Sequence, residues 1–197
     1  MAIVSSVSRV GTTEPFELQV ARGQISYHKT IFKFGFNSDI DDSLETVWAQ
    51  GGLYSHPSSA STMTVSSSST ADTSAGTGAR TVEIFGLDAD YNEVSETITL
   101  NGQTAVTTTN TYIRMNRAIV RSAGSGEQNA GVIYVGTGTV TAGVPANKYA
   151  TIAVGDNQTL MCVWTVPAGY SAYLTQTDVT LLTKTKNFFL STFTSFY

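Results

Sequence analysis

The chain has 197 residues, enough for one domain with a substantial core or for one domain plus an arm. Only 13% of its residues are Asp, Glu, Lys or Arg, and the net charge is −4, which argues against a nucleic-acid-binding protein. The low charge and the many β-branched residues favour an all-β protein whose surface is hidden in an assembly.

The first part of the sequence differs in pattern from the rest. We expect residues 1–36 to form an N-terminal arm or attachment segment and residues 37–197 to form the β domain. Within the arm, "FELQVA" (16–21) and "TIFKFGF" (30–36) have strand-like patterns. Gly23 separates them and allows the backbone to bend between two extended halves.

The Ser/Thr-rich region that follows has weaker signals. Residues 37–54 predict a short helical turn that ends at Gly51. Residues 55–79 predict a strand around Met63 and Val65, followed by a flexible loop. A Gly/Ser linker between two domains is the alternative interpretation of this stretch.

The clearest strand signal lies in "RTVEIFGLDADYNEVSETITLNG" (80–102). "TVEIFGL" and "VSETITL" predict two strands, and "DADYNE" (88–93) predicts the turn between them. Asn101-Gly102 predicts a second hairpin, with "TAVTTTN" pairing back, because both residues tolerate the positive φ of a type I′ turn.

Further short strands are expected in the C-terminal half. "YIRMNRAIVRSAG" (112–124) fits either a helix, with its arginines on one face, or a strand. "GVIYVG", "YATIAVG", "TLMCVWTV" and "SAYLTQTDVTLL" predict strands separated by turns. Seven or more short strands without convincing helices predict an antiparallel β-sandwich or a jelly-roll-like domain with an extended N-terminal segment.

The carboxylates of the first hairpin raise the question of a metal site. Asp88, Asp90 and Asn92 alternate as the oxygen ligands of a calcium loop do, but Glu93 stands where that loop requires glycine. A turn whose side chains bond local backbone is therefore favoured over calcium. The same argument applies to "NSDIDD" (37–42), where capping and solvation explain the acidic residues more simply than a metal.

Catalysis is not expected. We expect Glu83 and Glu96 to lie opposite or diagonal on the solvent face of the two strands, in a hairpin that offers no cleft for glycoside hydrolysis. His28 and His56 have no nucleophile motif, and with one cysteine they do not make a structural zinc site. The sequence thus predicts no enzyme, no metal and no cofactor.

The sequence also argues against a membrane protein and against disulfides. No apolar stretch approaches the ~20 residues of a membrane helix, and no signal peptide is expected. The only cysteine, Cys162, lies in an apolar run and is expected to be a small buried hydrophobe.

Aromatic residues are the best candidates for partner contacts. Phe32, Phe34 and Phe36 would form one apolar edge of an extended arm, suited to strand addition or packing on a partner. Phe188 and Phe189 belong to an apolar C-terminal run that forms either a final buried strand or a contact with a neighbouring subunit. A sugar-binding platform of tyrosines with Trp164 is the alternative use of aromatic residues.

Several stretches together resemble a widespread group of structural (virion) proteins of marine and aquatic tailed bacteriophages. They are "PFELQVARGQISYHKTIFKFGFN", "ETVWAQGGLY", "STADTSAGTGARTVEIFGLDADYNEVSETITLNGQTAV", "YIRMNRAIVRSAG" and "NQTLMCVWTVPAGYSAYLT". The resemblance spans roughly residues 14–176, and its most specific part is the G-L-D-x-D-Y-N-E-x-S-E-T block. It implies a virion component without saying which one.

We therefore expect a virion structural protein, assembled in the host cytoplasm, that acts by burying surface between subunits. A capsid decoration or cement protein, or a neck-associated protein, is the preferred role. Its partners would be other capsid, neck or tail subunits and copies of itself, with no nucleic acid and no membrane. The alternative is a lectin-like or receptor-binding module of a tail or head fibre.

Overall fold

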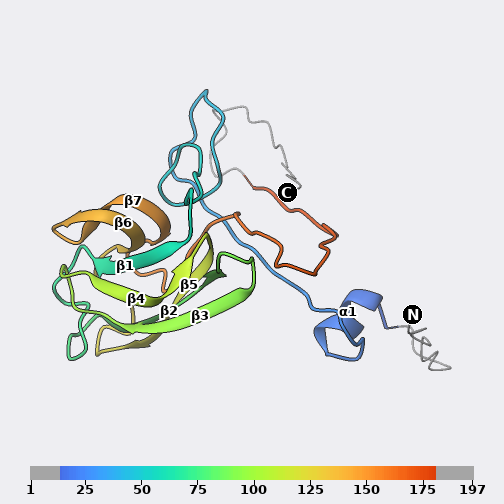
Figure 1. Cartoon of the computed structure of the whole chain (residues 1–197), viewed down its shortest axis with the longest axis horizontal. Coiled ribbons are helices and arrows are strands. Elements are labelled where there is room, and N and C mark those ends of the chain that lie inside the picture. Colours follow the sequence, from blue (N-terminus) through green and yellow to red (C-terminus); the bar gives the residue numbers. More distant parts are fainter. Residues whose placement is uncertain (1–13, 181–197) are drawn as a thin grey trace.

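The computed structural model describes residues 14–180, which form one short helix and seven strands (Figure 1). The elements are α1 (Phe16–Ala21), β1 (Ser61–Ser67), β2 (Ala79–Leu87), β3 (Glu93–Thr99), β4 (Val106–Tyr112), β5 (Arg114–Ala123), β6 (Ile133–Thr141) and β7 (Val144–Ile152). The single helix of these described residues has six residues, which is too short to cross a bilayer.

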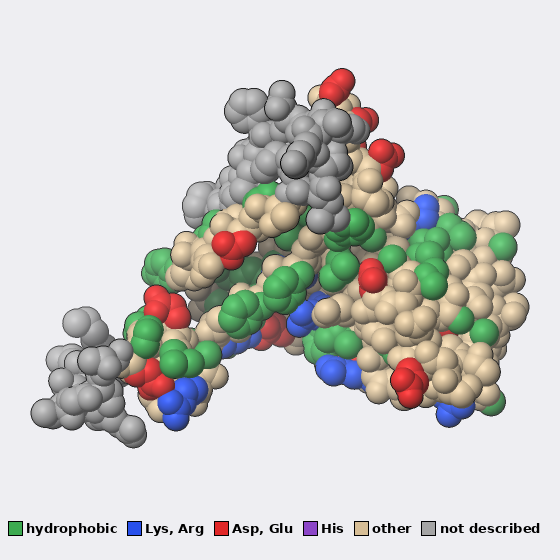
Figure 2. All heavy atoms as spheres, turned by 180° about the vertical axis from the view of Figure 1, so that it is seen from behind, with side chains coloured by type: hydrophobic (Ala, Val, Ile, Leu, Met, Phe, Trp, Pro, Cys, Tyr) green, Lys and Arg blue, Asp and Glu red, His purple; other side chains and the backbone are tan. Residues whose placement is uncertain are grey.

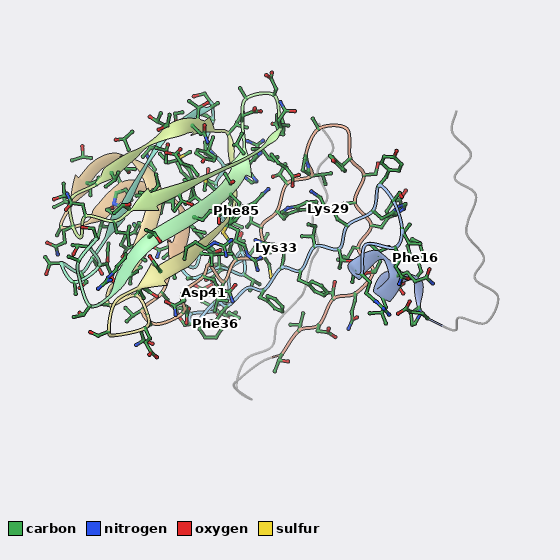
Figure 3. The ribbon with its side chains drawn as sticks, turned by 90° about the horizontal axis from the view of Figure 1, so that it is seen from below. Phe16, Lys29, Lys33, Phe36, Asp41 and Phe85 are labelled. Carbon is green, nitrogen blue, oxygen red and sulfur yellow. The ribbon has the colours of Figure 1, made fainter. Side chains whose placement is uncertain are left out.

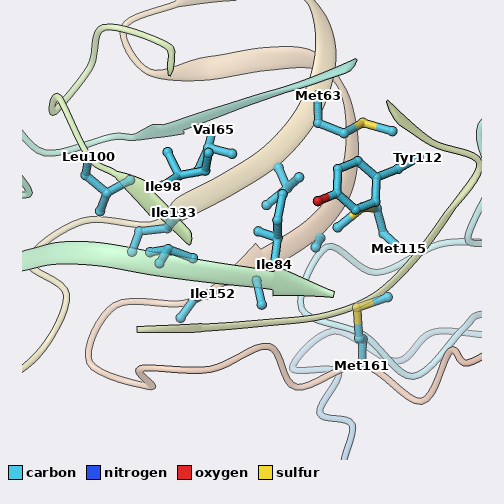
Figure 4. Packing of buried hydrophobic residues seen from close by; sticks show 14 of the residues in the cluster. Met63, Val65, Ile84, Ile98, Leu100, Tyr112, Met115, Ile133, Ile152 and Met161 are labelled. Carbon is cyan, nitrogen blue, oxygen red and sulfur yellow. The ribbon is translucent and has the colours of Figure 1, made fainter. Parts of the chain in front are cut away.

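The strands form two antiparallel sheets, with the orders β4-β1-β6-β7 and β3-β2-β5. Apolar side chains from all seven strands meet between the sheets (Figure 4). The predicted all-β antiparallel sandwich is therefore confirmed. The residues of this core that are fully or almost fully buried include Met63, Val65, Val82, Ile84, Ile98, Tyr112, Met115, Ile133, Val135 and Ile152.

The predicted hairpin is confirmed, because β2 pairs with β3 from Thr81↔Thr99 to Leu87↔Glu93. The turn is organised by Asp88, whose Oδ1 accepts hydrogen bonds from two backbone N–H groups of the turn, both at 2.9 Å. The bond from the backbone N–H of Asn92 is the main reason why the pKa of Asp88 lies below its usual value. Asp88 thus acts as a turn residue whose side chain bonds the local backbone.

The expected pairing of Glu83 with Glu96 on one face is wrong. Glu83 lies opposite Thr97, and Glu96 lies opposite the buried Ile84, so the two carboxylates point to different faces of the sheet. Glu83 forms a salt bridge with Arg121 at 2.6 Å. Glu96 accepts hydrogen bonds from backbone N–H groups of β4 at 2.9 and 3.0 Å, and so links the two sheets.

The second predicted hairpin, at Asn101-Gly102, is also wrong. Gly102 has the expected positive φ of 59°, but the backbone there crosses to the other sheet, where β4 pairs with β1. The carbonyl oxygen of Gly102 accepts a hydrogen bond from the N–H of Ser67 at 2.8 Å, and the N–H of Gly102 donates to Asp72 O at 2.8 Å. Long-range pairing has therefore overridden a local turn signal.

Residues 16–21, expected as a strand, form α1 instead. Pro15 precedes the helix with φ −56°, and its carbonyl oxygen accepts two N–H groups of the first turn at 3.1 Å. Gly23, with φ 69°, ends the turn. The short helical turn predicted within residues 37–54 is wrong, because no helix forms there. Asp41 Oδ1 instead accepts a hydrogen bond from the Ser43 N–H at 2.6 Å.

The ambiguous stretch 112–124 is largely strand β5. Residues 159–166 do not form the expected strand, although they run along the outer edge of β5, where Thr159 N donates to Ala118 O at 2.9 Å. Residues 171–180 of the last predicted strand are exposed and have no regular structure. Cys162 is exposed, so the expectation of a buried thiol is wrong.

The loop before β1 is attached to the sandwich by an aromatic cluster. Trp48 packs edge-on against Tyr54 with ring centroids 4.9 Å apart, and Tyr54 packs edge-on against His56 at 5.0 Å. Tyr54 also donates a hydrogen bond from its hydroxyl to Tyr149 O on β7 at 2.8 Å. Burial, and then the nearby charge of Arg114, lower the pKa of His56 to about 4.

We expect acid to destabilise the fold through His56. The unfolded protein takes up a proton near pH 6.5, whereas folded His56 stays neutral down to about 4. The stability that neutral His56 contributes is therefore fully present above pH 6.5 and is lost as the pH falls to about 4. We expect a loss of about 1–2 kcal/mol, less than the full pKa difference would give, because the imidazole is partly exposed.

Urea unfolding at pH 7 and at about pH 4.5 measures this effect, with His56→Phe as the matched variant that keeps an aromatic ring but cannot be protonated. The free energy of unfolding of wild type should fall more than that of His56→Phe. Equal pH dependence in the two proteins would contradict the assignment.

Candidate functional site: an aromatic ridge on the arm

Residues 31–37 form an extended segment that lies against the side of the sandwich. Figure 3 shows it running from Lys29 past Lys33 to Phe36, beside the sheet that carries Phe85. Phe32, Phe34 and Phe36 alternate along it and are 64%, 59% and 43% exposed. We call these three side chains the aromatic ridge.

The residues between the ridge positions face the domain and hold the segment there. Lys33 donates from Nζ to Asn116 O on β5 at 2.5 Å. The backbone N–H of Phe36 donates to Leu160 O at 3.3 Å, and the side chain of Asn37 hydrogen-bonds to Glu45. Alternation thus places Lys33 and Gly35 against the sandwich and leaves the phenylalanines that alternate with them exposed.

Among these anchors, Lys33 shows the strongest effect of burial on its chemistry. Burial is the main reason why the pKa of Lys33 is lowered to about 8, and the charge of Arg117 lowers it further. Cys162, close to Lys33, acts in the opposite direction. Although Cys162 as a whole residue is exposed, its sulfur lies against Gly35 of the arm, and this partial burial of the thiol raises its pKa.

Gly35 permits the closest approach between the segment and the domain. A Cβ at this position would lie 2.6 Å from Cys162 Sγ, 2.7 Å from Val47 O and 2.8 Å from Cys162 N. Real Cβ contacts are not this short, so no residue with a side chain fits without displacing the segment. The glycine is therefore required by space.

The backbone beside the ridge is available for pairing. Within residues 14–180, the backbone N–H and C=O groups of residues 31–35 make no hydrogen bond. An extended segment with unpaired backbone groups and exposed aromatic side chains is the form of surface to which a further strand adds.

A groove separates the arm from the outer face of the sheet β3-β2-β5. Its volume is about 450 Å³, within the range of ligand pockets. We call it the arm groove. Its apolar lining comes from Ile31, Phe32, Phe85, Val94, Ile119 and Trp164, and its positively charged lining from Lys33, Arg117 and Arg121.

Sequence reasoning located part of this site. The alternation of phenylalanines predicts the exposed ridge, whereas Phe188 and Phe189 lie outside the described residues. The roles of Lys33 and Gly35 and the existence of the arm groove were missed, because their partners lie far away in the sequence. Only the small residue and the lysine between the phenylalanines hinted that this face is not apolar.

Other candidate residues do not assemble into a second site. His28 lies on the arm, where its ring meets Phe16 edge-on with centroids 5.7 Å apart, while His56 belongs to the aromatic cluster near β7. Between residues 14 and 180, no three His, Cys, Asp or Glu side chains are grouped as metal ligands would be.

A scan against protein-family models, a search of curated proteins and a search of solved structures each gave no match for this protein.

Proposed function

We propose that the protein is a structural component of a tailed-phage virion, most simply a capsid decoration or cement protein or a neck-associated protein. Its chemistry is the burial of surface between subunits, with no catalytic step and no cofactor. Its partners are other virion proteins and further copies of itself. The resemblance to virion proteins supports the assignment to a phage particle. The aromatic ridge supports attachment by the burial of apolar surface.

The observation that carries the proposal is the exposure of the ridge on an anchored segment. Lone exposed apolar residues are common, but three exposed phenylalanines at alternate positions of one anchored segment form a row of apolar side chains. Full burial of one phenylalanine contributes roughly 1.5–3 kcal/mol, and partial exposure and ordering costs reduce this to about 1 kcal/mol for each ridge residue. Many copies on one particle would then attach stably.

The test is the variant Phe32→Ser/Phe34→Ser/Phe36→Ser. We expect it to fold normally and to bind particles about 100-fold more weakly, since three losses of about 1 kcal/mol multiply. The amount of protein that sediments with purified phage particles measures attachment. The matched control is Leu53→Ser/Val154→Ser/Tyr173→Ser, whose three residues are 67%, 56% and 87% exposed.

The control variant should attach as wild type does. Unchanged attachment of the ridge variant would overturn the role of the ridge. Absence of the wild-type protein from phage particles would overturn the virion assignment.

The second candidate, a lectin-like or receptor-binding module, rests on exposed tyrosines. Tyr170 and Tyr173 are 57% and 87% exposed, as sugar-stacking rings are. However, Lys29 Nζ lies 5.1 Å from the centre of the Tyr170 ring and occupies one of its faces. Glycan-array binding that Tyr173→Ser abolishes, with attachment of the ridge variant intact, would favour this candidate over the first.

A further inference from the structure

We infer that two copies of this protein join head to tail, with the acidic loop of one copy seated in the arm groove of the next. The acidic loop comprises residues 38–45, "SDIDDSLE". This inference adds a partner to the proposed function, and it is independent of the particle because it concerns the purified protein alone.

The arm groove has an excess of positive charge, because Lys33, Arg117 and Arg121 line it together with one carboxylate, that of Glu93. Of the basic residues in and beside it, Lys29 is paired with Glu93 and Arg121 is paired with Glu83, at 2.7 and 2.6 Å. Lys33 and Arg117, by contrast, form no salt bridge within the part of the molecule that the structure describes.

Apolar side chains also line the groove, and Figure 2 shows hydrophobic and basic side chains next to one another where the arm meets the sandwich. A segment that fills the groove should therefore carry both carboxylates and an apolar side chain.

The acidic loop has this composition. Asp39, Asp41 and Asp42 are all exposed, and Leu44 is 56% exposed. None of the three aspartates forms a salt bridge within residues 14–180. Figure 2 shows acidic side chains at the tip of this projecting part of the molecule. One short loop thus supplies both carboxylates, which match the basic lining of the groove, and an apolar side chain, which matches its apolar lining.

The loop is placed to meet another copy and not its own groove. Figure 1 shows the loop projecting away from both sheets, whereas the arm leaves the sandwich in another direction, toward α1. A head-to-tail contact uses the loop of one copy and the groove of the next, so each pair leaves one loop and one groove unfilled, and repeated contacts close into a ring or extend as a filament. Rings and repeating layers are the forms in which a neck or decoration protein would assemble.

The test is sedimentation velocity of the purified full-length protein at roughly 100 μM, in about 10 mM and about 500 mM salt. We expect self-association at low salt that weakens at high salt, because the contact pairs opposite charges that salt ions screen. A wild-type protein that is monomeric at low salt would overturn the inference.

Two charge-reversal variants locate the contact. The loop variant is Asp39→Lys/Asp41→Lys/Asp42→Lys, and the groove variant is Arg117→Glu. Each places like charges in contact, so each should associate at least tenfold more weakly than wild type. The control Glu127→Lys/Asp156→Lys makes the same kind of charge change as the loop variant at exposed positions of the sandwich, and it should associate as wild type does.

Mixing the two variants provides the decisive outcome. A head-to-tail contact predicts that loop and groove variants, each monomeric alone, associate with each other, because the intact loop of one meets the intact groove of the other. Failure of the mixture to associate, with melting temperatures unchanged, would overturn the inference and would leave the virion proposal standing.

Discussion

Replacing Asp72 by alanine is expected to lower the free energy of unfolding by about 3–5 kcal/mol. Asp72 is fully buried, and its Oδ1 accepts hydrogen bonds from the backbone N–H groups of Ala79 and Ala130 at 2.7 and 2.8 Å. Its Oδ2 accepts from Gly131 N at 2.8 Å and from Ser67 Oγ at 2.5 Å. Alanine would leave four donors without an acceptor, and each such buried group costs about 1–3 kcal/mol before local relaxation or water compensates.

The large effect is expected because Asp72 joins three separate parts of the sandwich. Its bonds connect the end of β1, the start of β2 and the loop that precedes β6. Within residues 14–180, no other carboxylate is bonded to all three. Loss of the carboxylate should therefore weaken the crossing between the sheets and not just one loop.

Urea unfolding measures the loss, with Asp72→Asn and Asp156→Ala as companions. Asp72→Asn keeps the shape but replaces one acceptor with a donor, so its cost should lie between wild type and Asp72→Ala. Asp156 is exposed, and its replacement should change stability by no more than about 0.5 kcal/mol. A cost below about 1 kcal/mol for Asp72→Ala would show that the network is not structural.

The parts of the fold that could be predicted are those specified by local alternation. The β2–β3 hairpin is predictable because apolar and polar residues alternate on both sides of a turn rich in Asp and Asn. The all-β class follows from many short stretches of this kind. Both predictions depend on neighbours in sequence, which are visible without a structure.

The wrong predictions concern residues whose partners are distant. The stretch around Asp72 predicts a flexible loop because it is rich in Ser, Thr and Gly, yet its carboxylate bonds residues up to 59 positions away. Asn101-Gly102 has a hairpin sequence, but β4 does not pair with the strand before this turn. It pairs with β1 in the other sheet. Residues 16–21 have a strand-like pattern, although Leu, Glu, Gln and Ala favour a helix once Pro15 starts it.

The candidate site also has one part that is predictable from local sequence and one part that depends on distant residues. The ridge is a local pattern of three alternating phenylalanines, and the sequence predicts it. The anchoring face is not predictable, because Lys33 bonds to Asn116, which is 83 residues away. A lysine and a glycine between phenylalanines indicate that this face is not apolar, but they do not identify the surface that it contacts.

Replacing Gly35 by valine is expected to detach the arm from the sandwich without unfolding the sandwich. The new Cβ would lie 2.6 Å from Cys162 Sγ and 2.7 Å from Val47 O, and the second contact is with backbone that cannot rotate away. Overpacking of this kind costs about 1–3 kcal/mol. The arm is held by few hydrogen bonds, so we expect this cost to be relieved by local opening of residues 31–37.

Limited trypsin digestion measures the opening, because Lys33 is held against Asn116 while Arg22 is exposed. Cleavage after Lys33 should become about tenfold faster or more in Gly35→Val, and cleavage after Arg22 should not change. Gly23→Val is the matched control, since its added Cβ would meet nothing within 4 Å, although its φ of 69° makes any side chain strained there.

Gly35→Val should also attach poorly to particles although its three ridge phenylalanines remain, because a detached arm no longer holds them in a row. Full attachment with fast cleavage after Lys33 would mean that the ridge binds as a flexible segment, and that its anchored geometry is unimportant.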